Sequence, residues 1–101
     1  MLHLVAFVTA QPGKRAALLD AFGAIVPAVR AEDGCIEYTP VVDAEGYPPA
    51  TPVGPDTFIV VEKWASREAW YVHVKAPHLV AYEAQTKNLV AKLVLHIMKD
   101  V

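Results

Sequence analysis

The stretch TFIVVEKWASREAWYVHVKAPHLVAYEAQTK, residues 57–87, decides how this chain folds. Its first eight residues have the two-residue period of a β-strand. One face of that strand carries Phe58, Val60, Glu62 and Trp64, and the other carries Ile59, Val61 and Lys63. Ser66 is a natural N-cap for the helix that follows, and Pro77 begins a second helical piece. The stretch therefore predicts a strand followed by two short helices.

The segments outside this stretch predict one long helix and three more strands. The predicted strands are Leu2–Ala10, Cys35–Val42 and the closing segment 88–101, and the predicted helix is Lys14–Ala31. In the closing segment, alternation puts Leu89, Ala91, Leu93, Leu95 and Ile97 on one side and Val90, Lys92, Val94, His96 and Met98 on the other.

Proline and glycine mark the breaks between these elements. Pro27 lies inside the long helix, where a missing backbone N–H is expected to kink or loosen it. Gly34 ends that helix region, and Pro40 indicates that the second strand is an edge strand or is bulged. Four prolines in 43–56 forbid regular structure there, so this loop is predicted to be a lid, an interface arm or a solvated connector.

The element order is β-α-β followed by β-α-β. This order predicts an α+β fold of the ferredoxin-like, split β-α-β kind, with one antiparallel sheet and helices on one face. With 101 residues, a single domain over 1–101 is expected. The strands are apolar on both faces and 54% of the residues are hydrophobic, so a second copy is expected to cover the open face as a homodimer.

Composition excludes several classes of partner and location. The net charge is −2 and no basic patch stands out, so nucleic acid is not an expected partner. Charged residues interrupt every long apolar run, so no membrane span is expected. Cys35 is the only cysteine, which excludes a disulfide within the chain and fits the reducing cytoplasm, and no signal peptide is indicated. No Cys/His cluster predicts a metal site.

The candidate site combines the polar and aromatic side chains of the opening stretch. If the face of the strand that carries Glu62 and Trp64 meets the helices, these two residues converge with His73, His78 and Tyr82. The result is a mainly apolar pocket with a few polar groups, which is the usual form of a small-molecule site.

Each candidate also has a purely structural interpretation. Trp64 and Trp70 fit core packing, and Tyr38 and Tyr82 fit half-buried rings with a wet hydroxyl. Glu62 needs a partner if it is buried, and an ion pair would suffice. His73 fits a buried histidine with satisfied hydrogen bonds, and His78 fits a helix cap or a solvent-facing ring.

Three segments resemble the antibiotic biosynthesis monooxygenase superfamily. They are EDGCIEYTPVVD, PDTFIVVEKWASREAW and HVKAPHLVAYEA, with an acidic-Gly-Cys turn, a strand ending in Glu-x-Trp, a helix carrying a His, and Pro-His before an aromatic residue. IVPAVRAEDGC and the proline-rich insert resemble the quinol monooxygenase branch. The resemblance covers nearly the whole chain.

The resemblance implies a dimeric α/β barrel and oxidation of a quinol or similar polyphenol by O₂ without flavin, haem or metal. It implies His73 as the first candidate base or hydroxyl partner, with His78 and Glu62 completing the catalytic set. It also implies an aromatic substrate site formed by Trp64, Trp70, Tyr82 and Tyr38.

Other branches of the superfamily imply other functions. Haem-degrading relatives carry an axial His on the second helix, where this chain has Glu83. A branch that isomerises a phosphorylated signalling sugar needs inward-pointing cations, for which Lys63, Arg67 and Lys75 are the candidates. A non-catalytic module that binds a small aromatic is a third alternative. The substrate, the choice between hydroxylation and simple oxidation, and the role of 43–56 stay open.

Overall fold

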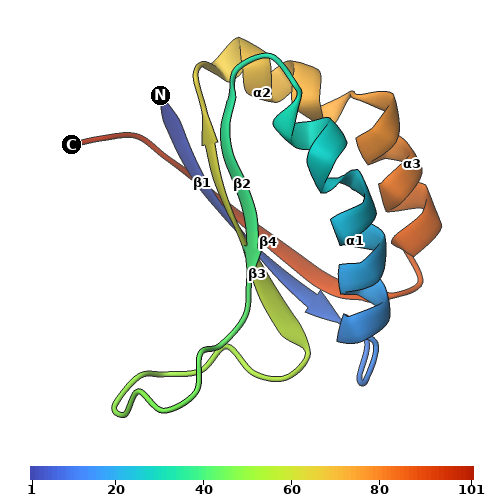
Figure 1. Cartoon of the computed structure of the whole chain (residues 1–101), viewed down its shortest axis with the longest axis vertical. Coiled ribbons are helices and arrows are strands. Elements are labelled where there is room, and N and C mark those ends of the chain that lie inside the picture. Colours follow the sequence, from blue (N-terminus) through green and yellow to red (C-terminus); the bar gives the residue numbers. More distant parts are fainter.

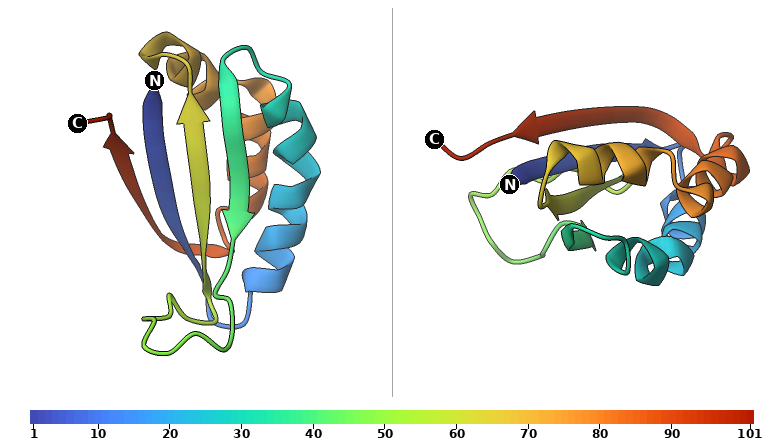
Figure 2. Two further views of the ribbon diagram at one scale, coloured as in Figure 1. Left: turned by 60° about the vertical axis from the view of Figure 1, so that its left-hand side comes forward. Right: turned by 90° about the horizontal axis from the view of Figure 1, so that it is seen from above.

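Four strands and three helices form the fold in the computed structural model, which describes residues 1–101 (Figure 1). Along the chain they are β1 (Leu2–Ala10), α1 (Arg15–Arg30), β2 (Cys35–Val41), β3 (Thr57–Trp64), α2 (Arg67–Val74), α3 (Pro77–Thr86) and β4 (Val90–Met98). The strands form one antiparallel sheet in the order β2-β3-β1-β4 (Figure 2, left). The predicted α+β, ferredoxin-like arrangement is confirmed.

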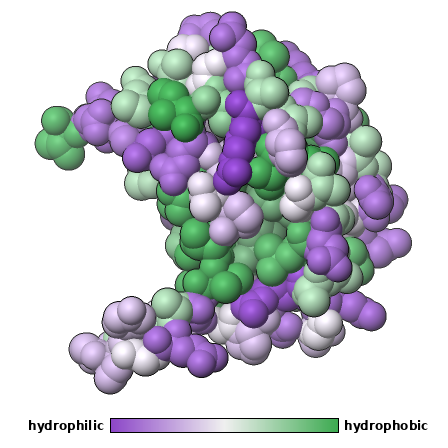
Figure 3. All heavy atoms as spheres, viewed as in Figure 1, coloured by the Kyte–Doolittle hydropathy of each residue, from purple (hydrophilic) through white to green (hydrophobic).

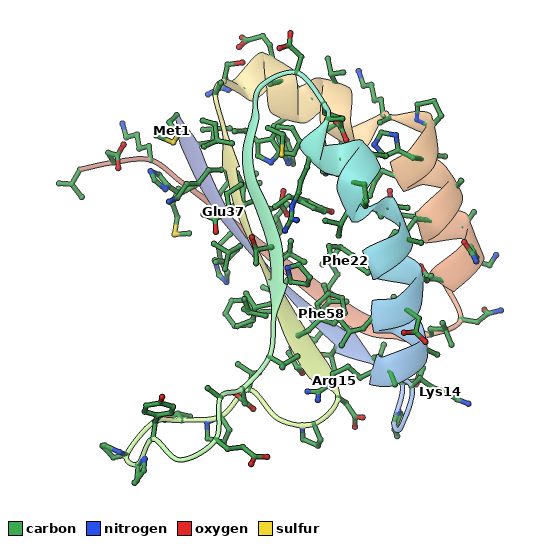
Figure 4. The ribbon with its side chains drawn as sticks, in the orientation of Figure 1. Met1, Lys14, Arg15, Phe22, Glu37 and Phe58 are labelled. Atoms are coloured by element: carbon green, nitrogen blue, oxygen red, sulfur yellow. The ribbon has the colours of Figure 1, made fainter.

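The helices cover one face of this sheet, and the core lies between the two layers (Figure 2, right). Every second residue of β1 and β3 is buried, so the predicted inward face of β3 is confirmed. From α1, Phe22 points towards Phe58 of β3, with ring centroids 5.4 Å apart in an edge-to-face pair (Figure 4). Such aromatic pairs contribute beyond the area that they bury.

Most predicted boundaries agree with the structure to within one or two residues. Helix α1 continues through Pro27 to Arg30, and the Ala31 N–H donates to the Pro27 carbonyl oxygen at 3.1 Å. Strand β2 lies at the sheet edge, as Pro40 predicted, and ends at Val41. The Ser66 cap is also confirmed, since its hydroxyl accepts the Ala69 N–H at 3.1 Å.

The alternation predicted for β4 is wrong at its start. A register shift in the pairing of β1 with β4 leaves Ala91 without a partner, while Lys92 and Val90 pair with β1. A bulge of this kind places two successive residues opposite one and changes which face later side chains occupy. As a result Val90 lies on the same side of the sheet as Leu93 and Leu95, and all three line one cavity.

The other face of the sheet is open and largely apolar. Figure 3 shows apolar atoms in the hollow between the C-terminal segment and the loop 43–56. A shallow depression of about 360 Å³ on this face is lined by Phe7, Val53 and Val94, among others. No helix is long and apolar enough to cross a membrane.

Two hydrogen bonds connect the two ends of the loop 43–56. The Asp43 carboxylate accepts the N–H groups of Val53 and Gly54 at 2.8 and 2.9 Å. These two hydrogen bonds lower the pKa of Asp43 below its usual range. Arg15 of α1 donates to the carbonyl oxygen of Gly54 at 3.2 Å, which connects the loop to the helix layer.

Candidate active site

A cavity of about 510 Å³ lies between the helices and the inward face of the sheet. Its volume falls within the range of small-molecule sites. Most of its lining is hydrophobic and comes from the sheet, α1, α2 and α3. Five of the predicted site residues line it, namely Tyr38, Glu62, Trp70, His73 and Tyr82, whereas Trp64 and His78 do not.

His73 is a buried polar group in the cavity wall that neighbours hold on several sides. Its side chain is buried, and its ring lies against two aromatic rings, with centroid distances of 4.5 Å to Trp64 and 5.4 Å to Tyr38. Nδ1 lies 3.0 Å from Oε2 of Glu32. The other ring nitrogen, Nε2, has no hydrogen-bond partner in the chain and is not sealed off by protein. His73 can therefore offer Nε2 to a ligand.

Helix α2 is held in place by the turn that follows α1. Gly34 in that turn has a φ of +84°, and a Cβ added there would lie 2.6 Å from the Cβ of Ala69 in α2. The Gly34 carbonyl oxygen also accepts the Ala65 N–H at 2.8 Å. Because glycine has no side chain, the turn and the helix approach each other closely. This contact brings Glu32 next to His73.

Glu32 is a site residue for which the sequence predicted no role. Its Oε2 contacts Nδ1 of His73 at 3.0 Å and Nε2 of His78 at 2.7 Å. Its Oε1 is buried without a partner. The carboxylate thus joins the segment after α1 to the end of α2 and the start of α3. Its position in the EDGC motif was the available signal, but the two histidines that it contacts are more than forty residues away.

Glu62 is the second acidic group at the site. It is buried on β3, and its Oε1 accepts the Trp64 indole N–H at 2.9 Å. Burial raises the pKa of Glu62, while the Trp64 hydrogen bond and the nearby His73 oppose the increase. No lysine or arginine forms an ion pair with it, so the ion-pair alternative is not what the structure contains.

Two phenols also belong to the polar part of the cavity. Tyr38 stacks on Phe22 with ring centroids 5.3 Å apart, and burial followed by the nearby Glu62 raises its pKa well above the usual range. Burial raises the pKa of Tyr82 to about 12. Both phenols therefore stay protonated at neutral pH and can donate a hydrogen bond to a ligand.

Trp64 and His78 support the site from outside the cavity. Trp64 is fully buried behind His73 and Glu62 and contacts both. His78 is partly exposed at the start of α3 and contacts Glu32. Trp70, in contrast, is half-buried and forms part of the wall.

The lining favours a neutral aromatic ligand over a strongly anionic one. Lys87 is the only lysine or arginine in the lining, and Lys63, Arg67 and Lys75 lie elsewhere. Binding of a phosphorylated ligand would require more cationic side chains that face the cavity. No group of three or more His, Cys, Asp or Glu side chains is arranged to hold a metal ion. The arrangement can bind an aromatic ring, hydrogen-bond its hydroxyl groups and accept a proton.

Two sequence comparisons relate this chain to known proteins. The family model described as antibiotic biosynthesis monooxygenase matches residues 1–85. The probable quinol monooxygenase YgiN of Escherichia coli is 34% identical over 101 residues, covering 98% of this chain and 97% of the relative.

Two solved structures share the fold of this chain. Protein PA3566 from Pseudomonas aeruginosa superposes with a TM-score of 0.84 at 25% identity, covering 99% of this chain and 93% of that one. Rv0793 from Mycobacterium tuberculosis superposes with a TM-score of 0.81 at 26% identity, covering 99% and 94%.

Proposed function

Because the chain belongs to the antibiotic biosynthesis monooxygenase family, we propose that it oxidises a hydroquinol or a similar polyphenol with O₂. Membership of this family supports a monooxygenase-type function. The proposed reaction needs no bound flavin, haem or metal. The observation that carries the proposal is His73, which lines a mainly apolar cavity of about 510 Å³ and whose Nε2 has no hydrogen-bond partner in the chain.

Deprotonation of the substrate is the step that the protein assists. A substrate hydroxyl donates to Nε2 of His73, which takes the proton as general base. The resulting anion is electron-rich enough to pass an electron to O₂. Two-electron oxidation then gives the quinone and hydrogen peroxide, whereas insertion of one oxygen atom gives a hydroxyquinone and water.

The remaining side chains have orienting roles in this proposal. Tyr38 and Tyr82 donate hydrogen bonds to substrate oxygens, and Trp70 forms an aromatic wall for the ring. Glu62 lies next to His73 and orients a second hydroxyl. The apolar lining limits water near the reacting anion and admits O₂.

The experiment compares His73→Ala with wild type in menadiol oxidation, with and without O₂. We expect oxygen-dependent quinone formation above the uncatalysed rate, and a loss of about 10²-fold or more in His73→Ala, since general bases contribute on that scale. Val72→Ala, a change on the exposed side of the same helix and outside the cavity, should retain the wild-type rate. Tight menadiol binding without any oxygen-dependent rate would instead identify a binding module.

We also propose a homodimer in which a second copy covers the open face of the sheet. Half-buried apolar side chains on this face, such as Val5, Phe7 and Val61, support the proposal. Two faces of this kind would bury each other as an isologous interface. Light scattering during size-exclusion chromatography should give twice the mass of 11.0 kDa, and a monomer would contradict it.

A further inference from the structure

We propose that Glu32 is a positioning residue that holds His73 in the tautomer with hydrogen on Nδ1, so that the lone pair of Nε2 faces the cavity. The consequence of this tautomer for catalysis rests on the proposed function, whereas the assignment of the tautomer itself does not. The inference starts from one carboxylate oxygen, Oε2 of Glu32, which lies 3.0 Å from Nδ1 of His73.

The chemistry of a carboxylate fixes the direction of this hydrogen bond. An ionised carboxylate only accepts, so Nδ1 of His73 must carry the hydrogen. In a neutral imidazole the other nitrogen is then the acceptor. The same oxygen takes a second hydrogen bond at 2.7 Å from Nε2 of His78. One oxygen thus orients two rings, and only that of His73 lines the cavity.

No other group in the chain fixes the His73 tautomer. Trp64 and Tyr38 pack on the ring at centroid distances of 4.5 and 5.4 Å and limit its movement, but neither makes a hydrogen bond to it. Packing alone does not distinguish the two nitrogens as proton carriers. Glu32 does, because of the two nitrogens of the His73 ring its carboxylate contacts Nδ1 alone.

His78 holds Glu32 from the other side. Its ring is more exposed than that of His73, with side-chain exposures of 28% and 4%. The hydrogen bond at 2.7 Å fixes the carboxylate from the start of α3. The predicted role of His78 therefore becomes indirect, because it restrains Glu32 and does not contact a ligand in the cavity.

Glu32 also acts during the proposed proton transfer. When Nε2 of His73 takes a proton from a substrate hydroxyl, both ring nitrogens carry hydrogen and the ring is positively charged. The Glu32 carboxylate, 3.0 Å from Nδ1, carries the opposite charge and stabilises this state. The same division of roles between acid and histidine operates in serine hydrolases.

The first measurement is of ring nitrogen chemical shifts by long-range ¹H–¹⁵N NMR at pH 8. Wild type should show His73 with hydrogen on Nδ1 and none on Nε2. In Glu32→Ala this preference should be lost, while Glu32→Gln, which keeps an acceptor oxygen, should retain it. Glu45→Gln, in the exposed loop 43–56, is the matched control and should match wild type.

The second measurement is of menadiol oxidation by the same variants. Glu32→Ala should lower kcat about 10²-fold with a smaller change in KM, because the substrate-contacting walls are intact. The kcat of Glu32→Gln should lie between those of wild type and Glu32→Ala, because glutamine can orient the ring but carries no charge.

The two measurements separate the possible failures. Wild-type His73 with hydrogen on Nε2, or a Glu32→Ala tautomer like that of wild type, overturns the positioning role whatever the activity. Hydrogen on Nδ1 together with full activity in His73→Ala overturns the proposed function and leaves the tautomer assignment intact. The wild-type spectrum decides the tautomer even if Glu32→Ala does not fold.

Discussion

Substitution of Gly34 by alanine should destabilise the protein by loosening the contact between the turn and α2. A non-glycine residue at a φ of +84° costs about 1–2 kcal/mol. The added Cβ would also lie 2.6 Å from that of Ala69, and overpacking of this kind costs about 1–3 kcal/mol. The free energy of unfolding should therefore fall by roughly 2–5 kcal/mol.

Gly13 provides a matched control for the backbone part of this cost. Its φ is +76°, and a Cβ added there meets nothing within 4 Å. Gly13→Ala should therefore cost only the backbone part, about 1–2 kcal/mol. The difference between the two variants measures the contact with α2.

Urea unfolding followed by the fluorescence of Trp64 and Trp70 is the assay. The midpoint should fall more in Gly34→Ala than in Gly13→Ala, at an unchanged m-value. The double variant Gly34→Ala/Ala69→Gly should recover part of the loss, less about 1 kcal/mol for glycine in a helix. Equal losses in the two single variants, with no recovery in the double, would refute the reasoning.

Two other predictions concern β3 and the start of α2. Since burial raises the pKa of Glu62, the folded state binds more protons than the unfolded state above the ordinary value of 4.5, so this group makes the unfolding free energy fall as pH rises. Glu62→Gln should reduce that fall in urea titrations between pH 4.5 and 8, and an unchanged pH dependence would contradict it. Ser66→Ala should cost about 0.5–2 kcal/mol, because the Ala69 N–H loses its acceptor. The same urea assay measures this, whereas Ser66→Asp, which keeps a capping oxygen, should stay near wild type; a loss in both would point to another cause.

Local patterns in the sequence were sufficient for most of the fold. The two-residue alternation of β3 predicted its inward face, including Glu62 and Trp64, because side-chain direction in a strand follows from backbone geometry alone. Pro40 predicted an edge strand, and Ser66 predicted a helix start, because each depends on the hydrogen bonds of its own backbone neighbourhood. The alternation failed at Ala91, since a bulge depends on the partner strand.

The candidate site was predicted in its residue types but not in its arrangement. The sequence by itself determined that Glu62 lies on an apolar strand face and His73 on the apolar side of a helix, because periodicity sets which sides are apolar. Only the tertiary structure decided that Glu32 lies between His73 and His78. That contact spans more than forty residues of chain and depends on the close approach of Gly34 to α2, which no local pattern encodes.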